Sequence, residues 1–206
     1  MKKTRKFKKI NTYRLFVTAF TFIMILSFVT YGKATQNRIS ESVLRLHIIA
    51  ASNSESDQKI KLLVRDRILK DAAFLFKDSK GAADSLKIAK ENIDFLTETA
   101  NDELMRQGSR DKAKIEIGEF SFPVKVYDNI MLPSGRYSAV RIIIGEGNGH
   151  NWWCVMYPPM CTLDGVTMDC GGKKKLKKSL SESDYKIISQ NADIRFKIVD
   201  MINSIF

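Results

Sequence analysis

The chain has 206 residues, which is enough for one compact domain and a leader segment. Its net charge of +11 is unevenly distributed, because residues 1–34 carry eight basic groups and no acidic group. Residues 35–170 carry 18 basic and 19 acidic groups, so this part is nearly neutral and offers no phosphate-binding basic face. The composition therefore argues against a nucleic-acid-binding protein.

The N-terminal segment is typical of an export signal. A basic stretch precedes Leu15 to Tyr31, a run of 17 residues without charge, and Gly32-Lys33-Ala34 then presents small residues to a signal peptidase. Seventeen residues is also the short limit for spanning a bilayer, so the segment is either cut after Ala34, which we favour, or kept as a membrane anchor. In both cases the positive-inside rule places the rest of the chain across the membrane.

Two helices are expected after a central strand at residues 43–51, which are mostly apolar and rich in branched side chains. Ser54 and Asp57 resemble a capping box that opens a helix over about residues 55–76. A second helix is expected over about residues 82–107, with Gly108 as its C-cap. Both have apolar stripes at helical spacing: Ile60, Val64, Ile68, Ala72 and Leu75 in the first, and Leu86, Ala89, Ile93, Leu96, Ala100 and Leu104 in the second.

The apolar period then changes to two, which predicts strands. They are expected within residues 114–126, 136–144 and 152–157, with a turn at residues 132–135. The fold class predicted is α+β: an N-terminal strand, two long helices and a mainly antiparallel sheet, in a single domain after the leader.

The C-terminal part of the chain begins with a basic segment. We divide the chain into a leader (1–34), an α+β domain (35–170) and a segment packed on that domain (171–206). Lys173–Lys178, with five lysines, is expected to be a solvated loop. A short helix is expected near residues 183–190, and residues 193–200 alternate like a strand, with a helix as the rival interpretation.

The densest cluster of unusual residues is GEGNGHNWWCVMYPPMC at 145–161. Glycines permit backbone dihedrals that other residues resist. If the segment is extended, the rings of Trp152 and Trp153 point to opposite faces. One ring can fill the core, whereas the other needs cover from a local loop or helix, or from a partner. This segment is thus either a recognition surface or a tightly packed corner.

Three cysteines, Cys154, Cys161 and Cys170, lie in one short window. Export permits a disulfide, and we favour Cys154–Cys161 because the two prolines between them can turn the chain back. Buried free thiols are the alternative. No CxxC spacing occurs and the chain has two histidines, so neither a zinc site nor any other metal or cofactor is expected.

Two polar groupings have competing interpretations. Asp57, Lys61 and Arg65 are spaced four residues apart on a helix, which predicts either an ion-pair ladder or a polar contact face. His47 on its strand, together with His150 and Glu146, suggests a secreted cell-wall hydrolase as the alternative function. No HExxH motif supports that alternative.

Two blocks resemble the stage II sporulation protein R family of endospore-forming bacteria. They are RLHIIAASNSESDQKIKLLVRD at 45–66 and GRYSAVRIIIGEGNGHNWWCVMYPPMC at 135–161, and RFKIVD at 195–200 is also typical of the family. Ala51 stands where the family usually has Asn, and Asn53 where Asp is common.

The resemblance implies an exported sporulation signal rather than an enzyme. Such a protein leaves the forespore for the space between the two membranes and activates a membrane-embedded aspartic protease of the mother cell, which cleaves the sigma-E precursor. A disulfide-stapled structural domain of the cell envelope is a third interpretation. The partner-binding candidates that the resemblance implies are His47, Ser52, Asp57, Gln58, Lys61, Arg65, Asp66, Glu146, His150, Asn151, Trp152 and Trp153, with Cys154 and Cys161 supporting the fold.

Overall fold

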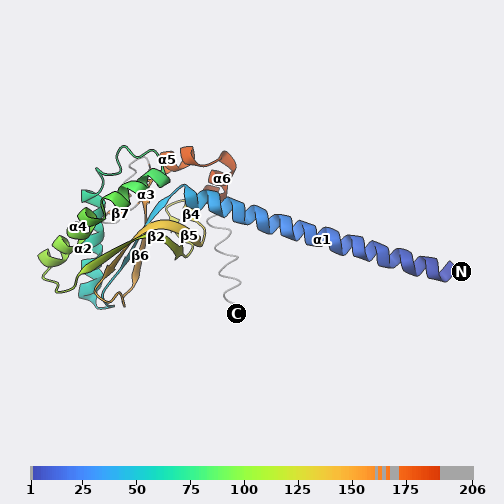
Figure 1. Ribbon diagram of the computed structural model, residues 1–206, viewed down its shortest axis with the longest axis horizontal. Coiled ribbons are helices and arrows are strands. Elements are labelled where there is room, and N and C mark those ends of the chain that lie inside the picture. The colour runs from blue at the N-terminus through green and yellow to red at the C-terminus, as the bar shows by residue number, and fades with distance from the viewer. Residues whose placement is uncertain (1, 161, 164–165, 168–171, 191–206) are drawn as a thin grey trace. The chain divides into compact units, whose positions relative to one another are not determined.

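A computed structural model describes residues 2–160, 162–163, 166–167 and 172–190 of the chain (Figure 1). The chain divides into two compact units, with the boundary between Asn37 and Arg38. The strand or helix expected at residues 193–200 lies outside the described residues.

The leader forms the first helix, α1, over Lys2–Glu41. Its part from Thr12 to Glu41 is the one helix among the described residues that is long and apolar enough to cross a membrane. A signal sequence near an N-terminus has the same length and composition, so the helix is compatible with both fates of the leader considered above.

The second unit is built on a mixed four-stranded sheet in the order β2-β5-β1-β6. The central strand β1 runs parallel to β5 and antiparallel to β6, and β2 pairs antiparallel with β5. The α+β class is confirmed, and two of these three pairings are antiparallel. The strands are β1 (Leu44–Ile49), β2 (Ala113–Phe122), β5 (Gly135–Ile144) and β6 (Asn151–Tyr157).

Two short hairpins accompany this sheet. In the first, β3 (Lys125–Tyr127) pairs with β4 (Ile130–Leu132). In the second, β7 (Thr162–Leu163) pairs with β8 (Val166–Thr167).

Helix α2 (Glu55–Asp71) begins at the expected cap. The Ser54 hydroxyl accepts a hydrogen bond from the Asp57 amide at 3.1 Å. The Ser54 amide donates to the Ser52 hydroxyl, and that hydroxyl donates to the Asp57 carboxylate at 2.5 Å. The capping box is therefore closed through Ser52. The helix ends about five residues earlier than the sequence predicted.

The expected single helix over residues 82–107 is wrong, because Asn92 interrupts it. The chain forms α3 (Ala82–Glu91) and α4 (Ile93–Arg106) instead, with Asn92 at φ −116° and ψ 25°. The Asn92 backbone amide bonds the Ile88 and Ala89 carbonyls, and its side-chain amide donates to the Ile88 carbonyl at 2.8 Å, so the first helix ends on Asn92. Gly108 follows α4 at φ +71°, as its predicted capping role requires.

The sheet separates two apolar clusters. On one face, Leu46 and Ile48 of β1 pack with α2, α3 and α4. Figure 1 shows these helices beside the sheet. On the other face, Phe122, Tyr137 and Val155 pack with the β3–β4 hairpin and the C-terminal helices. Alternation along each strand therefore sends neighbouring residues into different clusters.

The expected loop at Lys173–Lys178 is also wrong. These residues belong to α5 (Gly172–Ser179), because Leu176 is buried and anchors one side of the helix. The lysines lie around the remaining surface, where their charge stays solvated. The expected short helix near residues 183–190 is confirmed as α6 (Glu182–Gln190).

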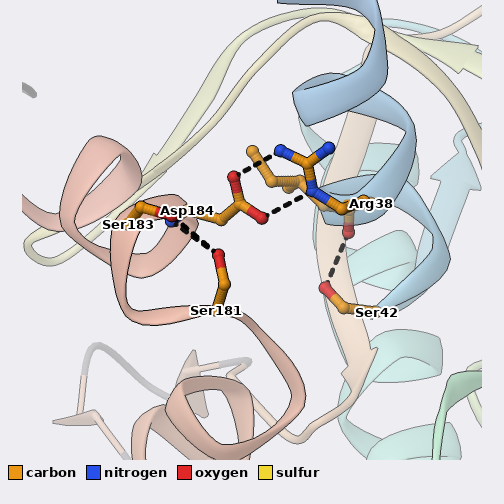
Figure 2. A network of polar contacts seen from close by, with 6 residues as sticks. Arg38, Ser42, Ser181, Ser183 and Asp184 are labelled. Atoms are coloured by element: carbon orange, nitrogen blue, oxygen red, sulfur yellow. Dashed lines mark hydrogen bonds and ion pairs between the residues drawn. The ribbon is translucent and has the colours of Figure 1, made fainter. Parts of the chain in front are cut away.

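A bidentate ion pair attaches α6 to the start of the second unit (Figure 2). The Arg38 guanidinium donates from Nε and Nη2 to the two carboxylate oxygens of Asp184, at 2.8 and 2.9 Å. The hydrogen bond from Arg38 holds the pKa of the Asp184 carboxyl below its usual value. The Asp184 side chain is only 1% exposed, whereas that of Arg38 is 47% exposed.

This difference in exposure predicts an asymmetric response to mutation. Arg38→Ala leaves a buried carboxylate without its charge partner and should lower the free energy of unfolding by about 2 kcal/mol. Asp184→Asn keeps one oxygen that can accept from Arg38 and removes the buried charge, so it should cost only about 1 kcal/mol. Urea unfolding of both variants, with the exposed Ser183→Ala as control, measures the difference. Equal losses would contradict the view that the carboxylate is the vulnerable partner.

Candidate functional site

The pairing of β1 with β6 brings the two motif blocks together. The loop after β1 and the loop before β6 exchange backbone hydrogen bonds, from the Gly149 amide to the Ala50 carbonyl at 2.9 Å and from the Asn148 amide to the Ala51 carbonyl at 3.2 Å. We call residues 50–58 and 145–153 together the joined-loop surface. Its two halves lie far apart in the sequence, and the sequence alone left their proximity undetermined.

Glycine is required where the two loops touch. A Cβ atom on Gly149 would lie 2.2 Å from the Ser52 carbonyl oxygen and 2.8 Å from the Ala50 Cβ. Gly145 and Gly147 have φ values of +55° and +67°, in the left-handed region that favours glycine. The three glycines therefore set both the path and the closeness of the loop.

A chain of polar contacts crosses the junction between the blocks. The Gln58 side-chain amide donates to the Ser52 carbonyl at 2.8 Å. The Lys61 ammonium donates to the Gln58 side-chain oxygen at 2.6 Å and to the His150 carbonyl at 3.0 Å. Lys61 is buried, and burial lowers its pKa, with the nearby Arg65 charge adding to the effect. Lys61 therefore connects α2 to the loop before β6.

The predicted ion-pair ladder does not form. Asp57 binds the Ser52 hydroxyl, Lys61 binds Gln58 and His150, and Arg65 pairs with the adjacent Asp66 at 2.6 Å. Asp57, Lys61 and Arg65 therefore bind other groups and not one another.

The two tryptophans lie on opposite faces of the sheet. Trp152 packs on the helical side, where the Arg65 guanidinium carbon lies 4.4 Å from the ring centroid. Trp153 lies on the other side and stacks on His47, with ring centroids 3.8 Å apart and planes inclined by 15°. Both rings are half-buried. Neighbouring side chains thus cover part of each ring, and the rest of each ring is exposed at the surface.

His47 lies in a row of side chains that crosses all four strands. The register places Glu116, Arg141, His47 and Trp153 next to one another. Glu116 and Arg141 form an ion pair, and the His47 Nε2 lies 2.7 Å from the Asn151 side-chain oxygen. Burial lowers the pKa of His47, and the Arg141 and Arg45 charges lower it further, against the hydrogen bond to Asn151.

Arg45 is a buried charge that sequence reasoning did not single out. Its guanidinium lies over the rings of Phe122, Tyr127 and Tyr137, with the nearest centroid at 4.2 Å, and donates to the Tyr127 hydroxyl. Burial raises the pKa of Tyr137 to about 12, so this phenol stays protonated. The signal available in the sequence was the alternation of Arg45 with His47, which places both on one face.

The residues of the hydrolase alternative are not assembled into a metal site. His47 is buried on β1, whereas Glu146 and His150 lie exposed in the loop before β6. Among the described residues no group of three or more histidine, cysteine or acidic side chains is placed to hold a metal ion. Cys154 is buried on β6, and Cys161 lies outside the described residues, so their pairing stays a prediction.

The close approach at Gly149 predicts a strong effect of one added methyl group. Gly149→Ala should lower the free energy of unfolding by about 3 kcal/mol, because the Cβ meets backbone atoms that cannot yield without separating the loops. Gly118→Ala is the matched control, since its Cβ would meet nothing nearer than Phe120 at 3.9 Å. Urea unfolding of both variants tests this, and equal tolerance would contradict the loop packing.

The lowered pKa of His47 predicts a loss of stability in acid. Above the unfolded value of 6.5 the histidine is neutral in both states, and its contribution does not change with pH. Below 6.5 the unfolded chain binds the proton first, so stability falls until the pH reaches the lower folded pKa. His47→Gln should reduce the difference in unfolding free energy between pH 7 and pH 5. An unchanged difference in His47→Gln would contradict this assignment.

The comparisons with known proteins agree with the two motif blocks. A family model described as Stage II sporulation protein R matches residues 40–167, which include both blocks. A relative named Stage II sporulation protein R, from Bacillus subtilis (strain 168), is 29% identical over 150 residues, covering 73% of this chain and 67% of the relative. No solved structure matches the chain. The family expected from the sequence is therefore confirmed: this chain belongs to the stage II sporulation protein R family.

Proposed function

We propose that this protein is an exported sporulation signal that activates a membrane-embedded aspartic protease by binding its extracytoplasmic part. The protease, in turn, cleaves the precursor of the mother-cell sigma factor E. The observation that carries the proposal is the joined-loop surface, in which both family blocks meet at one place. Family membership and the apolar helix near the N-terminus support the sporulation role and the export step.

The chemistry of the joined-loop surface suits binding better than bond-making. Its inner polar groups are engaged: Ser52 binds Asp57, and both Gln58 and the His150 carbonyl accept from Lys61 of α2. Its outer groups, Glu146 and His150, are exposed. The inner groups therefore fix the shape of the surface, while the outer groups and the tryptophan edges are free to contact a partner.

Activation requires a difference in affinity. A ligand shifts the protease towards its active form only if it binds that form more tightly than the inactive one. A tenfold shift in the ratio of the two forms needs about 1.4 kcal/mol of differential binding. Half-buried tryptophans at the centre of a contact are able to supply energies of this order.

Reconstitution tests the proposal directly. The full chain, the membrane protease and the sigma-factor precursor are expressed together, and cleavage of the precursor is followed by immunoblot. We expect cleavage only when all three are present. His150→Ala should reduce the cleavage rate at least about tenfold, because it removes an exposed group without touching the core, and Trp152→Ala or Trp153→Ala should abolish it while export continues.

The control is Lys87→Ala, which removes an exposed side chain on α3 outside both blocks and should leave cleavage unchanged. Unfolding of each variant in urea separates lost contacts from lost folding. Normal processing with both tryptophans replaced would contradict the proposed contact. Hydrolysis of peptidoglycan by the purified chain, lost in His150→Ala, would instead favour the hydrolase.

A further inference from the structure

The second family block lies on an edge of the sheet. The strand order β2-β5-β1-β6 leaves β2 at one side and β6 at the other. Among the described elements β6 pairs only with β1. An unpaired edge presents backbone donors and acceptors to which another extended chain can bind.

Two hydrogen bonds determine which backbone groups of β6 point away from the sheet. The His150 carbonyl accepts from the Ala50 amide, so residue 150 faces β1. The Val155 carbonyl accepts from the Met160 amide, so residue 155 faces the other side. Since these directions alternate along a strand, the amides and carbonyls of Asn151 and Trp153 point outward. No described residue pairs with them through a backbone hydrogen bond.

The two edges of the sheet differ in how they are protected. Edge strands commonly carry charged side chains, which discourage pairing with another chain. The edge strand β2 has Lys114, Glu116 and Glu119. The edge strand β6 reads NWWCVMY, with no charge and no proline. Its three aromatic residues and Val155 are favourable for pairing.

We propose that the outer edge of β6, at Asn151–Trp153, binds an extended segment of the protein partner as an added strand of the sheet. The inference rests on the proposed function and identifies the mode of contact within it. The partner's backbone hydrogen-bonds to the amides and carbonyls of Asn151 and Trp153. This is strand addition, in which backbone bonds contribute affinity and alternate side chains contribute specificity.

The two tryptophans determine which side chains the added strand carries. Successive residues of that strand lie next to Trp153 on one face and Trp152 on the other. Aromatic and β-branched residues make the most favourable cross-strand pairs with such rings. The segment is therefore an apolar, proline-free stretch in extended conformation, and its flanks reach the exposed Glu146 and His150.

A second copy of this chain is a less suitable occupant than a partner segment. The outward groups span only Asn151 to Trp153, and beyond them the Val155 carbonyl already binds Met160. Pairing of two such short edges would bury far less than the roughly 1,200 Å² of a stable protein interface. A segment of a larger partner is not limited to this edge, because the exposed Glu146 and His150 offer the rest of the partner further contacts.

Hydrogen exchange of the full chain in detergent, with and without the purified membrane protease, tests the proposal without any mutation. The amides of Asn151 and Trp153 should exchange freely in the chain alone and at least about tenfold more slowly in the complex. The outward amides of β2 are the internal reference. The Lys112 carbonyl accepts from the Gly145 amide towards β5, so Glu119 and Ser121 face away and should keep their exchange rates.

A pair of proline variants checks the same point when binding to the purified membrane protease is measured. Trp153→Ala removes the ring and keeps the amide, whereas Trp153→Pro removes both, so the proline variant should bind the protease at least about tenfold more weakly than the alanine variant. The matched control is Ser121→Pro, which removes an outward amide from the other edge and should bind normally. Circular dichroism confirms that each variant is folded.

Each outcome decides between distinct possibilities. A complex that forms without slowing exchange at Asn151 and Trp153 overturns the edge assignment and leaves the proposed function intact. If exchange slows when this chain is concentrated in the absence of the protease, the occupant is a second copy of the chain. That result also overturns the proposal of a partner segment. Absence of any complex, with cleavage independent of this chain, overturns the proposed function and the inference together.

Discussion

The structure depends on the contact between the loop that leaves β1 and the loop that enters β6. At Gly149 the second loop lies so close to Ser52 that no side chain fits, and backbone hydrogen bonds join the two loops. Strand β1 is also central and pairs with β5 on its other side. Because backbone bonds fix the loops, the side chains of the joined-loop surface have defined positions before any partner binds.

The face of the sheet opposite the long helices has an unusual construction. Arg45 is fully buried there among three aromatic rings, without a carboxylate partner among the described residues. Cation–π contacts of a desolvated guanidinium contribute about 2 kcal/mol, which offsets part of the cost of burying the charge. Burial lowers the pKa of His47 where it stacks on Trp153, and the Arg141 and Arg45 charges lower it further.

The local elements were predictable from the sequence because their signals are local. The Ser54 cap, the strand at 43–51 and Gly108 depend on residue types within a few positions of one another, and the structure places each as expected. The break at Asn92 was missed because the apolar stripe continues through it, from Ala89 of α3 to Ile93 of α4. The helix at Lys173–Lys178 was missed because one buried leucine, Leu176, outweighs five solvated lysines.

The candidate site could be predicted only as two separate lists of residues. Periodicity places Asp57, Lys61 and Arg65 on one helical face. An ion-pair ladder was the simplest interpretation of that spacing. The structure assigns them to three different partners, because Lys61 reaches a carbonyl that lies 89 positions further along the chain. No pattern within one sequence predicts that Lys61 lies next to the His150 carbonyl. It follows from the register of β1 with β6, which tertiary packing decides.

The arrangement of the two tryptophans explains how one short strand can serve both folding and binding. Each ring is covered on one side, Trp152 by Arg65 and Trp153 by His47, and this cover fixes its orientation. A fixed ring loses little conformational entropy when a partner covers its remaining surface, so more of the contact energy is available for binding. A backbone edge between two such rings is a site where shape, apolar area and hydrogen bonding coincide, whereas the edge at β2 carries Lys114, Glu116 and Glu119.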